Sequence, residues 1–402
     1  SAAQTGRTHD RTRPMLQQRQ KVLAKAPSTH DPKWAVRNLK RTREQNMKPT
    51  IFSPSVDRRA LLAIFAALAA LAALFGNRVT ASAQTQIAGP DSVLPSWKDG
   101  PAKQAIIDFV HATTDTGSPK FVPAEERIAT FDQDGTLWVE HPIYSQLMYC
   151  LDRVPVLAAE KPELKHAEPF KTVLSGNREA IAKLTLPDLE KIIVATLAGM
   201  TTDEFNAEVK KWVGTAKDPR WKKLYTELVY QPMLEVMTYL RANGYRTFIV
   251  TGFGQDFVRV YSQQVYGIPP EQVIGSALAV KYAYAKDGKP ILIKEPKLML
   301  NDNDAGKPEG IHLEIGRPPN AAFGNSTGDR QMLEYTGAGD GARLMMLVLH
   351  DDAMREYAYG PAQGLPDTKV GTFTQPLYDE AKKNGWTVIS VKNDWSRIFT
   401  FE

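Results

Sequence analysis

The sequence predicts a doubly wound parallel α/β sheet with a helical insertion, and three observations lead to this fold class. Short apolar runs that are typical of buried strands alternate with segments of helical periodicity. Polar motifs follow several of these runs directly, at the carboxyl ends of the strands, where such sheets bind ligands. Residues 140–230 carry helical patterns without a buried-strand run, so we expect them to be inserted between the first two core strands.

The core elements follow in chain order from their apolar spacing. Strand-like apolar runs occur at Ile128–Phe131, 247–250, 321–323, Leu344–Leu349 and, as an edge strand, 387–391. Residues 273–300 alternate more and contain the turn signal Asp287-Gly288, which predicts a β-hairpin. Helices are expected over 102–112, 231–243 and 253–266. In the second of these, Pro232 fits the first turn and Gly244 fits the C-terminal cap.

Charge is unevenly distributed along the 402 residues. Residues 1–83 contain 15 of the 50 Lys and Arg residues and 4 of the 45 Asp and Glu residues. Residues 84–402 therefore contain 35 basic and 41 acidic residues and have a net charge of −6. A nucleic-acid-binding protein is expected to carry its positive charge on the folded domain. We therefore expect no nucleic-acid partner. The single cysteine, Cys150, excludes an intrachain disulfide and is typical of a small buried side chain.

The front of the chain is interpreted as a targeting segment. Residues 1–46 are polar and basic and are expected to be a disordered extension, because they have few apolar side chains to bury. Residues 47–83 have the parts of a signal peptide, with the basic pair Arg58-Arg59, an apolar run over 60–75 and a small-residue cleavage site. The pair resembles a twin-arginine signal, and the general secretory route stays open. We expect a periplasmic or secreted protein that touches the membrane only through an uncleaved signal.

The first chemical motif is Asp132-Gln133-Asp134-Gly135-Thr136, directly after the apolar run that ends at Phe131. Two carboxylates spaced i, i+2 after a buried strand converge on one small volume if the chain turns at the glycine. Like charges that close require a cation or a shared proton. One carboxylate can then attack a substrate while the other gives and takes a proton. An Asp-Gly pair alone would be commonly just a turn.

Three further motifs follow later strand signals. Thr251 and Gly252 stand between a buried strand and an expected helix N-terminus, where a hydroxyl and free N–H groups form an anion site. Lys307 opens a short helix and can give a point positive charge to a phosphoryl group. Asn325 and Asp329 lie in a Gly-rich loop after a short strand, where a carboxylate can hold Mg²⁺ through oxygen. All four motifs follow apolar runs in a fixed order along the chain. A shared site explains this arrangement better than coincidence does.

With these motifs, residues 121–350 resemble the haloacid dehalogenase-like superfamily, near its phosphoserine phosphatase branch. The resemblance implies that Asp132 is the nucleophile, forming an aspartyl-phosphate, and that Asp134 protonates the leaving oxygen and then activates water. It implies that Thr251 and Gly252 hold phosphate oxygens and that Lys307 stabilises the nucleophile and the phosphoryl charge. An acid at the position of Asp134 is typical of the phosphatases and phosphotransferases of the family, whereas its dehalogenases lack one.

The resemblance also implies a Mg²⁺ cofactor, held by Asp132, the main-chain carbonyl of Asp134 and the loop with Asn325 and Asp329. The family loop usually reads Gly-Asp, and this chain has Gly324-Asn325 instead. Asparagine keeps a carbonyl oxygen and loses a charge, so we expect weaker or shifted metal binding. The expected activity is that of an exported Mg-dependent phosphomonoesterase acting on a small phosphorylated substrate.

The domain organisation follows from the motifs and the resemblance together. Residues 84–120 are expected to form a lead-in segment, 121–139 and 231–402 the α/β core, and 140–230 a helical cap that sets substrate choice. Trp138, Glu140, His141 and Arg178 are candidates for facing the substrate, and each is equally well explained as a core, capping or surface residue.

Two other functions stay open at this stage. A phosphotransferase or mutase of the same superfamily would pass the phosphoryl group to a hydroxyl instead of water. A catalytically weak binding protein of the cell envelope would be consistent with Asn325. The sequence leaves the oligomeric state and the natural substrate open.

Overall fold

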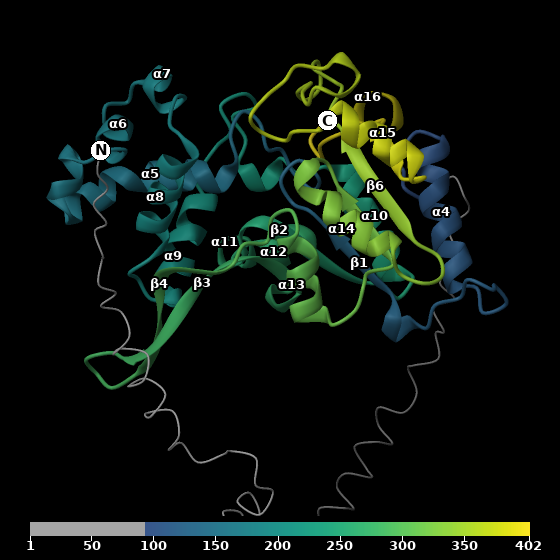
Figure 1. The fold of residues 1–402 in the computed structure, drawn as a ribbon, viewed down its shortest axis with the longest axis horizontal. Coiled ribbons are helices and arrows are strands. Elements are labelled where there is room, and N and C mark those ends of the chain that lie inside the picture. The colour runs from purple at the N-terminus through teal and green to yellow at the C-terminus, as the bar shows by residue number, and fades with distance from the viewer. Residues whose placement is uncertain (1–92) are drawn as a thin grey trace, which may run out of the picture. The chain divides into compact units, whose positions relative to one another are not determined.

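A computed structural model describes residues 93–402, and Figure 1 shows their fold. The predicted disordered extension over 1–46 and the signal peptide over 47–83 lie outside the described residues, as does the beginning of the lead-in segment. No helix within 93–402 is long and apolar enough to cross a membrane.

A seven-stranded sheet forms the centre of the fold, in the order β4-β3-β2-β1-β5-β6-β7. All neighbouring strands are parallel except β3 and β4, which form the predicted antiparallel hairpin. This confirms the predicted α/β fold class. The strands are β1 (Ile128–Phe131), β2 (Arg246–Gly254), β3 (Val273–Tyr284), β4 (Pro290–Leu300), β5 (Ala321–Gly324), β6 (Leu344–Leu349) and β7 (Thr387–Ser390).

The strand register aligns the carboxyl ends of β1 and β5 with each other and with the middle of β2. Phe131 of β1 pairs with Ile249 of β2 on one side and with Phe323 of β5 on the other. β1 lies where the strand order reverses, since the chain continues to β2 on one side and later to β5 on the other. Ligands of doubly wound sheets bind at such a switch point. One edge of the sheet therefore brings together the residues that follow Phe131, those that follow Phe323 and those near the end of β2.

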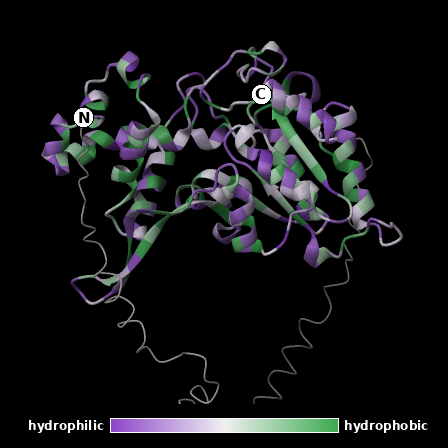
Figure 2. Cartoon of the chain, viewed as in Figure 1, coloured by the Kyte–Doolittle hydropathy of each residue, from purple (hydrophilic) through white to green (hydrophobic). Residues whose placement is uncertain are grey.

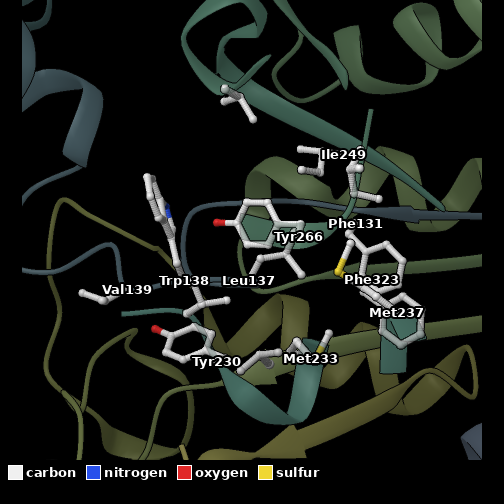
Figure 3. Close-up of a cluster of buried hydrophobic side chains, with 14 of the residues drawn as sticks. Phe131, Leu137, Trp138, Val139, Tyr230, Met233, Met237, Ile249, Tyr266 and Phe323 are labelled. Atoms are coloured by element: carbon white, nitrogen blue, oxygen red, sulfur yellow. The ribbon is translucent and has the colours of Figure 1, made fainter. Parts of the chain in front are cut away.

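The core lies on both faces of the sheet. Ile128 and Phe131 of β1 belong to two separate clusters of buried apolar side chains, one on each face. Figure 3 shows part of the larger cluster, in which the rings of Phe131 and Phe323 stack with centroids 4.5 Å apart. Burial on both faces explains why these strands are short continuous apolar runs, as the green colour of β6 shows in Figure 2. Cys150 is buried within the larger cluster, as predicted.

The α-helices are α4 (Pro101–Thr114), α5 (Ser145–Glu160), α6 (Phe170–Leu174), α7 (Arg178–Ile181), α8 (Leu186–Leu197), α9 (Thr202–Val213), α10 (Gln231–Ala242), α11 (Gln255–Arg259), α12 (Ser262–Tyr266), α13 (Gly306–Ile315), α14 (Arg330–Gly337), α15 (Gln375–Lys383) and α16 (Val391–Asp394). The 3₁₀-helices are η3 (Ala124–Glu126), η4 (Pro162–His166), η5 (Tyr225–Glu227), η6 (Pro270–Gln272), η7 (Thr327–Asp329) and η8 (Ala362–Gly364).

Helix α10 shows how the sequence determines an element. Met233, Val236 and Leu240 recur at helical spacing and are fully buried against the sheet. Proline occupies the first turn, where its missing N–H has no intrahelical partner. Gly244 follows the helix with a φ of +80°, a backbone conformation that glycine adopts without strain.

The expected helix over 253–266 is wrong in two respects. Strand β2 continues to Gly254, and two short helices, α11 and α12, replace one continuous helix. The break lies at Tyr261, whose φ of −124° is not helical. Its ring stacks on Trp138 with centroids 5.0 Å apart, and its hydroxyl accepts a hydrogen bond from Gln133 at 2.6 Å. These contacts with the loop that follows β1 accompany the break between the two helices.

Helices α5 to α9 lie between β1 and β2 in the chain, where an insertion was predicted. Figure 1 shows them on the side of the sheet that ends in β3 and β4, away from β6, with α9 beside the hairpin and α7 far from it. The main-chain N–H of Gly199 donates to the carbonyl of Lys294 at 2.8 Å, and the N–H of Lys294 donates to Met200 at 2.9 Å. The hairpin therefore joins the inserted helices to the sheet. The cap role of 140–230 and its boundaries stay predictions.

Candidate active site

A cavity of about 300 Å³ lies at the carboxyl ends of the central strands. Of the seven predicted site residues, all but Asn325 line it. Its lining consists of Asp132, Asp134, Glu140, Tyr144, Thr251, Gly252, Phe253, Asn301, Asn303, Lys307, Ser326 and Asp329. A second cavity, beside His111 on α4, contains none of the predicted motifs. The structure therefore brings the four separate sequence motifs together at one site.

Asp132 is held at the end of β1, where its N–H donates to the carbonyl of Phe323 at 2.9 Å. The ammonium of Lys307 donates to Asp132 Oδ1 at 2.6 Å, to the carbonyl of Val250 at 2.6 Å and to Asp329 Oδ1 at 2.9 Å. Asp132 Oδ2 has only a long contact of 3.4 Å from the hydroxyl of Thr136. One carboxylate oxygen is thus fixed, and the other is nearly free.

The glycine at the start of α13 allows this close approach of Lys307. A Cβ at Gly306 would overlap the carbonyl oxygen of Asn301. Burial lowers the pKa of Lys307, but the charges of Asp132 and Asp329 outweigh it and raise the pKa above the ordinary lysine value. The ammonium therefore stays charged between the two carboxylates.

Burial raises the pKa of the Asp132 carboxyl to about 7, and the charge of Asp329 adds to the rise while the Lys307 ammonium opposes it. Burial raises the pKa of Asp134 to about 6, against the hydrogen bond of 2.8 Å that Trp138 Nε1 donates to its Oδ1. Two neighbouring acids with raised pKa values can exchange protons near neutral pH. Such perturbation is frequent at functional sites.

The chain turns sharply between the two acids and the residues that follow them. Gly135 has a φ of +78°, and a Cβ there would overlap the side chains of Asn325 and Glu140. The predicted turn at this glycine is therefore present, and only a residue without a side chain fits it. The turn lets both Asp132 and Asp134 face the cavity.

Thr251 and Gly252 line the cavity from within β2, because the strand continues to Gly254. The expectation that a helix starts directly after Gly252 is wrong. The hydroxyl of Thr251 accepts the N–H of Phe253 at 3.2 Å, and the carbonyl of Gly252 accepts the hydroxyl of Ser276 at 2.7 Å. An anion site here would use the hydroxyl and strand N–H groups. Their role in phosphate binding stays a prediction.

The loop after β5 folds around Asp329. The Oδ2 atom of Asp329 accepts the N–H groups of Asn325 at 2.9 Å and Ser326 at 3.0 Å. A Cβ at Gly324 would lie 2.5 Å from the Cβ of Asp329, so glycine permits the tight fold. The carboxylate of Asp329 thus holds the loop and one side of Lys307.

Asn325 is buried beside the cavity and bonds on both sides of its amide. Its Oδ1 accepts the hydroxyl of Thr136 at 3.2 Å, and its Nδ2 donates to Glu140 Oε1 at 2.7 Å. The hydroxyl of Tyr359 donates to the same oxygen at 2.8 Å. Burial raises the pKa of Glu140 well above its ordinary value, and the bond from Tyr359 opposes this rise. Glu140 is therefore a third acid of the site.

His350, from the C-terminal region, supports the turn at Gly135 and is not among the residues predicted from the sequence. His350 donates from Nε2 to the carbonyl of Gly135 at 2.7 Å, and its Nδ1 lies 3.0 Å from Glu356 Oε2. The ring stacks on Tyr359 with centroids 4.6 Å apart. A signal was available, because His350 directly follows the strand that ends at Leu349, like the other site residues.

The remaining candidates for facing the substrate have different positions. Trp138 is buried and bonds Asp134, whereas the ring of His141 packs on Tyr359 with centroids 3.8 Å apart. Neither lines the cavity, and neither does Arg178 on α7. Of the four, Glu140 lines the cavity.

The chemistry of the donor set decides whether Mg²⁺ fits. Asp132, Asp134 and Glu140 line the cavity with carboxylate oxygens, Asn325 contacts Glu140 beside it, and hard cations such as Mg²⁺ prefer oxygen. Residues 93–402 contain no group of three or more His, Cys, Asp and Glu side chains already arranged around one metal position. The residue types suit Mg²⁺, and the Mg²⁺ ligands stay a prediction.

A family model described as haloacid dehalogenase-like hydrolase matches residues 129–334. The matched segment begins in β1, ends in α14 and contains every predicted site residue. Together with the doubly wound sheet and the cavity at its switch point, this shows that the chain belongs to the haloacid dehalogenase-like hydrolases. The predicted resemblance is thereby confirmed.

Several solved structures are similar to this chain at low identity. A protein of unknown function from Bordetella pertussis Tohama I is 16% identical, with 66% of this chain and 98% of that chain covered and a TM-score of 0.41. A functionally unknown protein from Anaerococcus prevotii DSM 20548 is 16% identical, with 61% and 85% covered and a TM-score of 0.42.

A probable phosphoserine phosphatase from Vibrio cholerae is 14% identical, with 56% of this chain and 57% of that chain covered and a TM-score of 0.31. No curated protein matches the chain. Family membership therefore depends on the match over residues 129–334.

Proposed function

We propose that the protein is an exported, Mg-dependent phosphomonoesterase that uses Asp132 as its nucleophile. The observation that carries this proposal is the asymmetry of the Asp132 carboxylate. Lys307 fixes Oδ1 at 2.6 Å, whereas Oδ2 has only a long contact, and Asp132 lines the cavity. A carboxylate held in this way is oriented for attack through one oxygen.

In the first step, Asp132 Oδ2 forms a bond to the phosphorus atom, and the bond from phosphorus to the ester oxygen breaks. Asp134 gives its proton to the departing oxygen, for which a pKa of about 6 is well matched near neutral pH. Trp138 holds the other side of Asp134 through Oδ1 at 2.8 Å. The products of this step are an alcohol and an aspartyl-phosphate on Asp132.

In the second step, Asp134, now ionised, takes a proton from water. The resulting hydroxide attacks phosphorus, and the bond between phosphorus and Asp132 breaks, which releases phosphate and restores the carboxylate. Lys307 supplies a charge that stabilises the developing negative oxygens. Thr251 and Gly252 would orient the phosphate from β2.

Mg²⁺ would be held by Asp132, the carbonyl of Asp134 and the loop of Asn325 and Asp329. When bound, it would supply positive charge that neutralises the oxygens of the phosphoryl group.

Phosphate release from a panel of phosphomonoesters tests the activity. The purified full chain is assayed with Mg²⁺ and with EDTA, beside Asp132→Asn and, as a matched control, the exposed Asp287→Asn. We expect turnover that EDTA stops and that Asp132→Asn loses, with Asp287→Asn equal to wild type. Phosphate release that survives Asp132→Asn would contradict the mechanism. An added alcohol acceptor identifies a phosphotransferase if phosphoryl transfer exceeds phosphate release.

Export is supported by the pattern of residues 47–83. Cell fractionation of the full chain should place the protein outside the cytoplasm. Replacing Arg58 and Arg59 by lysine should retain it inside if the twin-arginine route is used, and should leave export unchanged if the general secretory route is used. A wild-type protein that stays in the cytoplasm would contradict export.

A further inference from the structure

Glu140 is a buried carboxylate without a cationic partner among residues 93–402. Its side chain lines the active-site cavity and the residue is 2% exposed. Its hydrogen-bond donors, Asn325 Nδ2 and the hydroxyl of Tyr359, are both neutral. By contrast, Asp132 and Asp329 share the ammonium of Lys307. A buried carboxylate is costly unless a proton or a cation neutralises it.

The two oxygens of Glu140 have different surroundings. Both hydrogen bonds end on Oε1. Oε2 accepts no hydrogen bond from the described residues. It is also absent from the set of unpaired polar atoms that solvent cannot reach, so it keeps some solvent access. Because Glu140 lines the cavity, Oε2 is the oxygen that the cavity can reach. It therefore offers a free acidic oxygen at the cavity that Asp132 and Asp134 also line.

The residue opposite Glu140 matches this arrangement. The amide of Asn325 directs Nδ2 to Glu140 at 2.7 Å and Oδ1 to Thr136 at 3.2 Å. An aspartate at 325 would place two carboxylates at hydrogen-bond distance, which requires a shared proton or a cation. Positions 140 and 325 thus hold one carboxylate and one amide, and the charge lies on residue 140.

We propose that Glu140, through Oε2, is a ligand of the divalent cation that this site binds together with Asp132. Glu140 thereby supplies the carboxylate that Asn325 lacks, and the amide of Asn325 orients it. This inference rests on the proposed function, because the cation belongs to the same reaction. It replaces the expectation that Asn325 weakens metal binding, because Glu140 supplies the acidic oxygen that Asn325 lacks.

Binding of Mn²⁺ to the full chain, without substrate, tests the inference. The free Mn²⁺ signal is measured by electron paramagnetic resonance during titration, so no activity is needed. Glu140→Gln keeps the shape and removes the charge, and should weaken Mn²⁺ binding about 10-fold or more. The exchange variant Glu140→Gln/Asn325→Asp restores one carboxylate and one amide, and should bind within about 3-fold of wild type, on the same scale.

Two controls separate metal binding from damage to the fold. Tyr359→Phe removes one hydrogen bond of Glu140 and leaves its charge, so it should weaken Mn²⁺ binding less than Glu140→Gln does. Glu163→Gln removes an exposed charge and should have no effect. Circular dichroism establishes that each variant is folded, and the exchange variant keeps the test valid if Glu140→Gln alone unfolds.

The outcomes also distinguish this inference from the proposed function. If Asp132→Asn weakens Mn²⁺ binding and folded Glu140→Gln does not, Glu140 is a neutral structural acid and the inference is wrong. If neither variant changes Mn²⁺ binding, the cavity is not the cation site and the proposed function loses its cofactor. Loss in Glu140→Gln with recovery in the exchange variant supports the inference.

Discussion

At the scale of single residues, the site concentrates acidic groups around one lysine. Lys307 contacts Asp132 and Asp329, and a further carboxyl group, Asp302, lies nearby in the sequence and is fully buried. Neither oxygen of Asp302 has a hydrogen-bond partner among the described residues. Burial raises the pKa of Asp302 to about 8, although the charge of Lys307 opposes the rise.

This raised pKa gives a stability effect with a definite sign. The folded chain holds the proton of Asp302 up to about pH 8, whereas the unfolded chain loses it near the ordinary value of 3.8. Between these pH values the folded state binds more protons, so this group's contribution to stability falls as the pH rises. Replacing Asp302 by Asn removes the titration, and the variant should gain stability relative to wild type as the pH rises.

Urea unfolding at pH 5 and pH 8 measures the effect. The difference in unfolding free energy between Asp302→Asn and wild type should increase with pH, by up to about 1.4 kcal/mol per pH unit in this window. The exposed Asp287→Asn serves as the control and should show no such trend. A difference that is the same at both pH values would mean that Asp302 is not buried as a neutral acid.

At the scale of elements, the turn after Asp134 is a piece of backbone that both its conformation and its neighbours constrain. Gly135 has a φ of +78°, and a side chain there would meet Asn325 and Glu140. Gly288 in the β3–β4 hairpin has a similar φ of +83° but open space around it. A side chain at Gly288 would cause backbone strain alone, whereas one at Gly135 would also crowd the site. Comparing variants at these two glycines therefore distinguishes the two effects.

Gly288→Ala should cost about 1 kcal/mol of stability, from backbone strain alone, and should keep activity. Gly135→Ala should cost at least about 2 kcal/mol more, and should lose activity about 100-fold or more, because a displaced loop misplaces Asp132 and Asp134. Thermal unfolding and phosphate release measure both effects. Equal activity of the two variants would show that the turn does not position the site.

The sequence predicts elements well where the cause of structure is local. Apolar runs locate β1 and β6, and the Asp-Gly turn locates the hairpin. It fails at 253–266 because the cause there is distant. The N–H of Gly254 donates to Gln146 Oε1 at 2.8 Å, and this contact from α5 accompanies the extended backbone at the end of β2. A partner 108 positions away cannot be read from periodicity.

The same distinction applies to the candidate site. Asp132, Asp134, Lys307 and Asp329 each follow an apolar run, so their meeting could be predicted from strand order. The contact between Glu140 and Asn325 could not, because it depends on the side-chain orientation that Gly135 allows.

At the scale of the whole molecule, the region after the family match completes the site. Residues 129–334 contain the predicted motifs, yet the carbonyl of Gly135 is held by His350 and the carboxylate of Glu140 by Tyr359. His350 therefore holds the turn after Asp134 from outside the matched segment. Removing its ring should disturb the reaction more than the fold.

His350→Ala should lower kcat about 10-fold or more, because the loop loses the donor to Gly135. His312→Ala, which changes an exposed histidine on α13, should keep wild-type activity. Circular dichroism shows whether each variant keeps its secondary structure. Wild-type kcat in folded His350→Ala would mean that the hydrogen bond does not position the loop.

The bond between His350 and Gly135 also has a consequence for the order in which the molecule is made. The two residues are 215 positions apart in the chain. At about 5–20 residues per second, a ribosome adds His350 roughly 10–40 s after Gly135. During that interval the nascent chain already contains Asp132 and Asp134 and lacks the ring that supports the turn after them. The site is therefore complete only after residue 350 has been added to the chain.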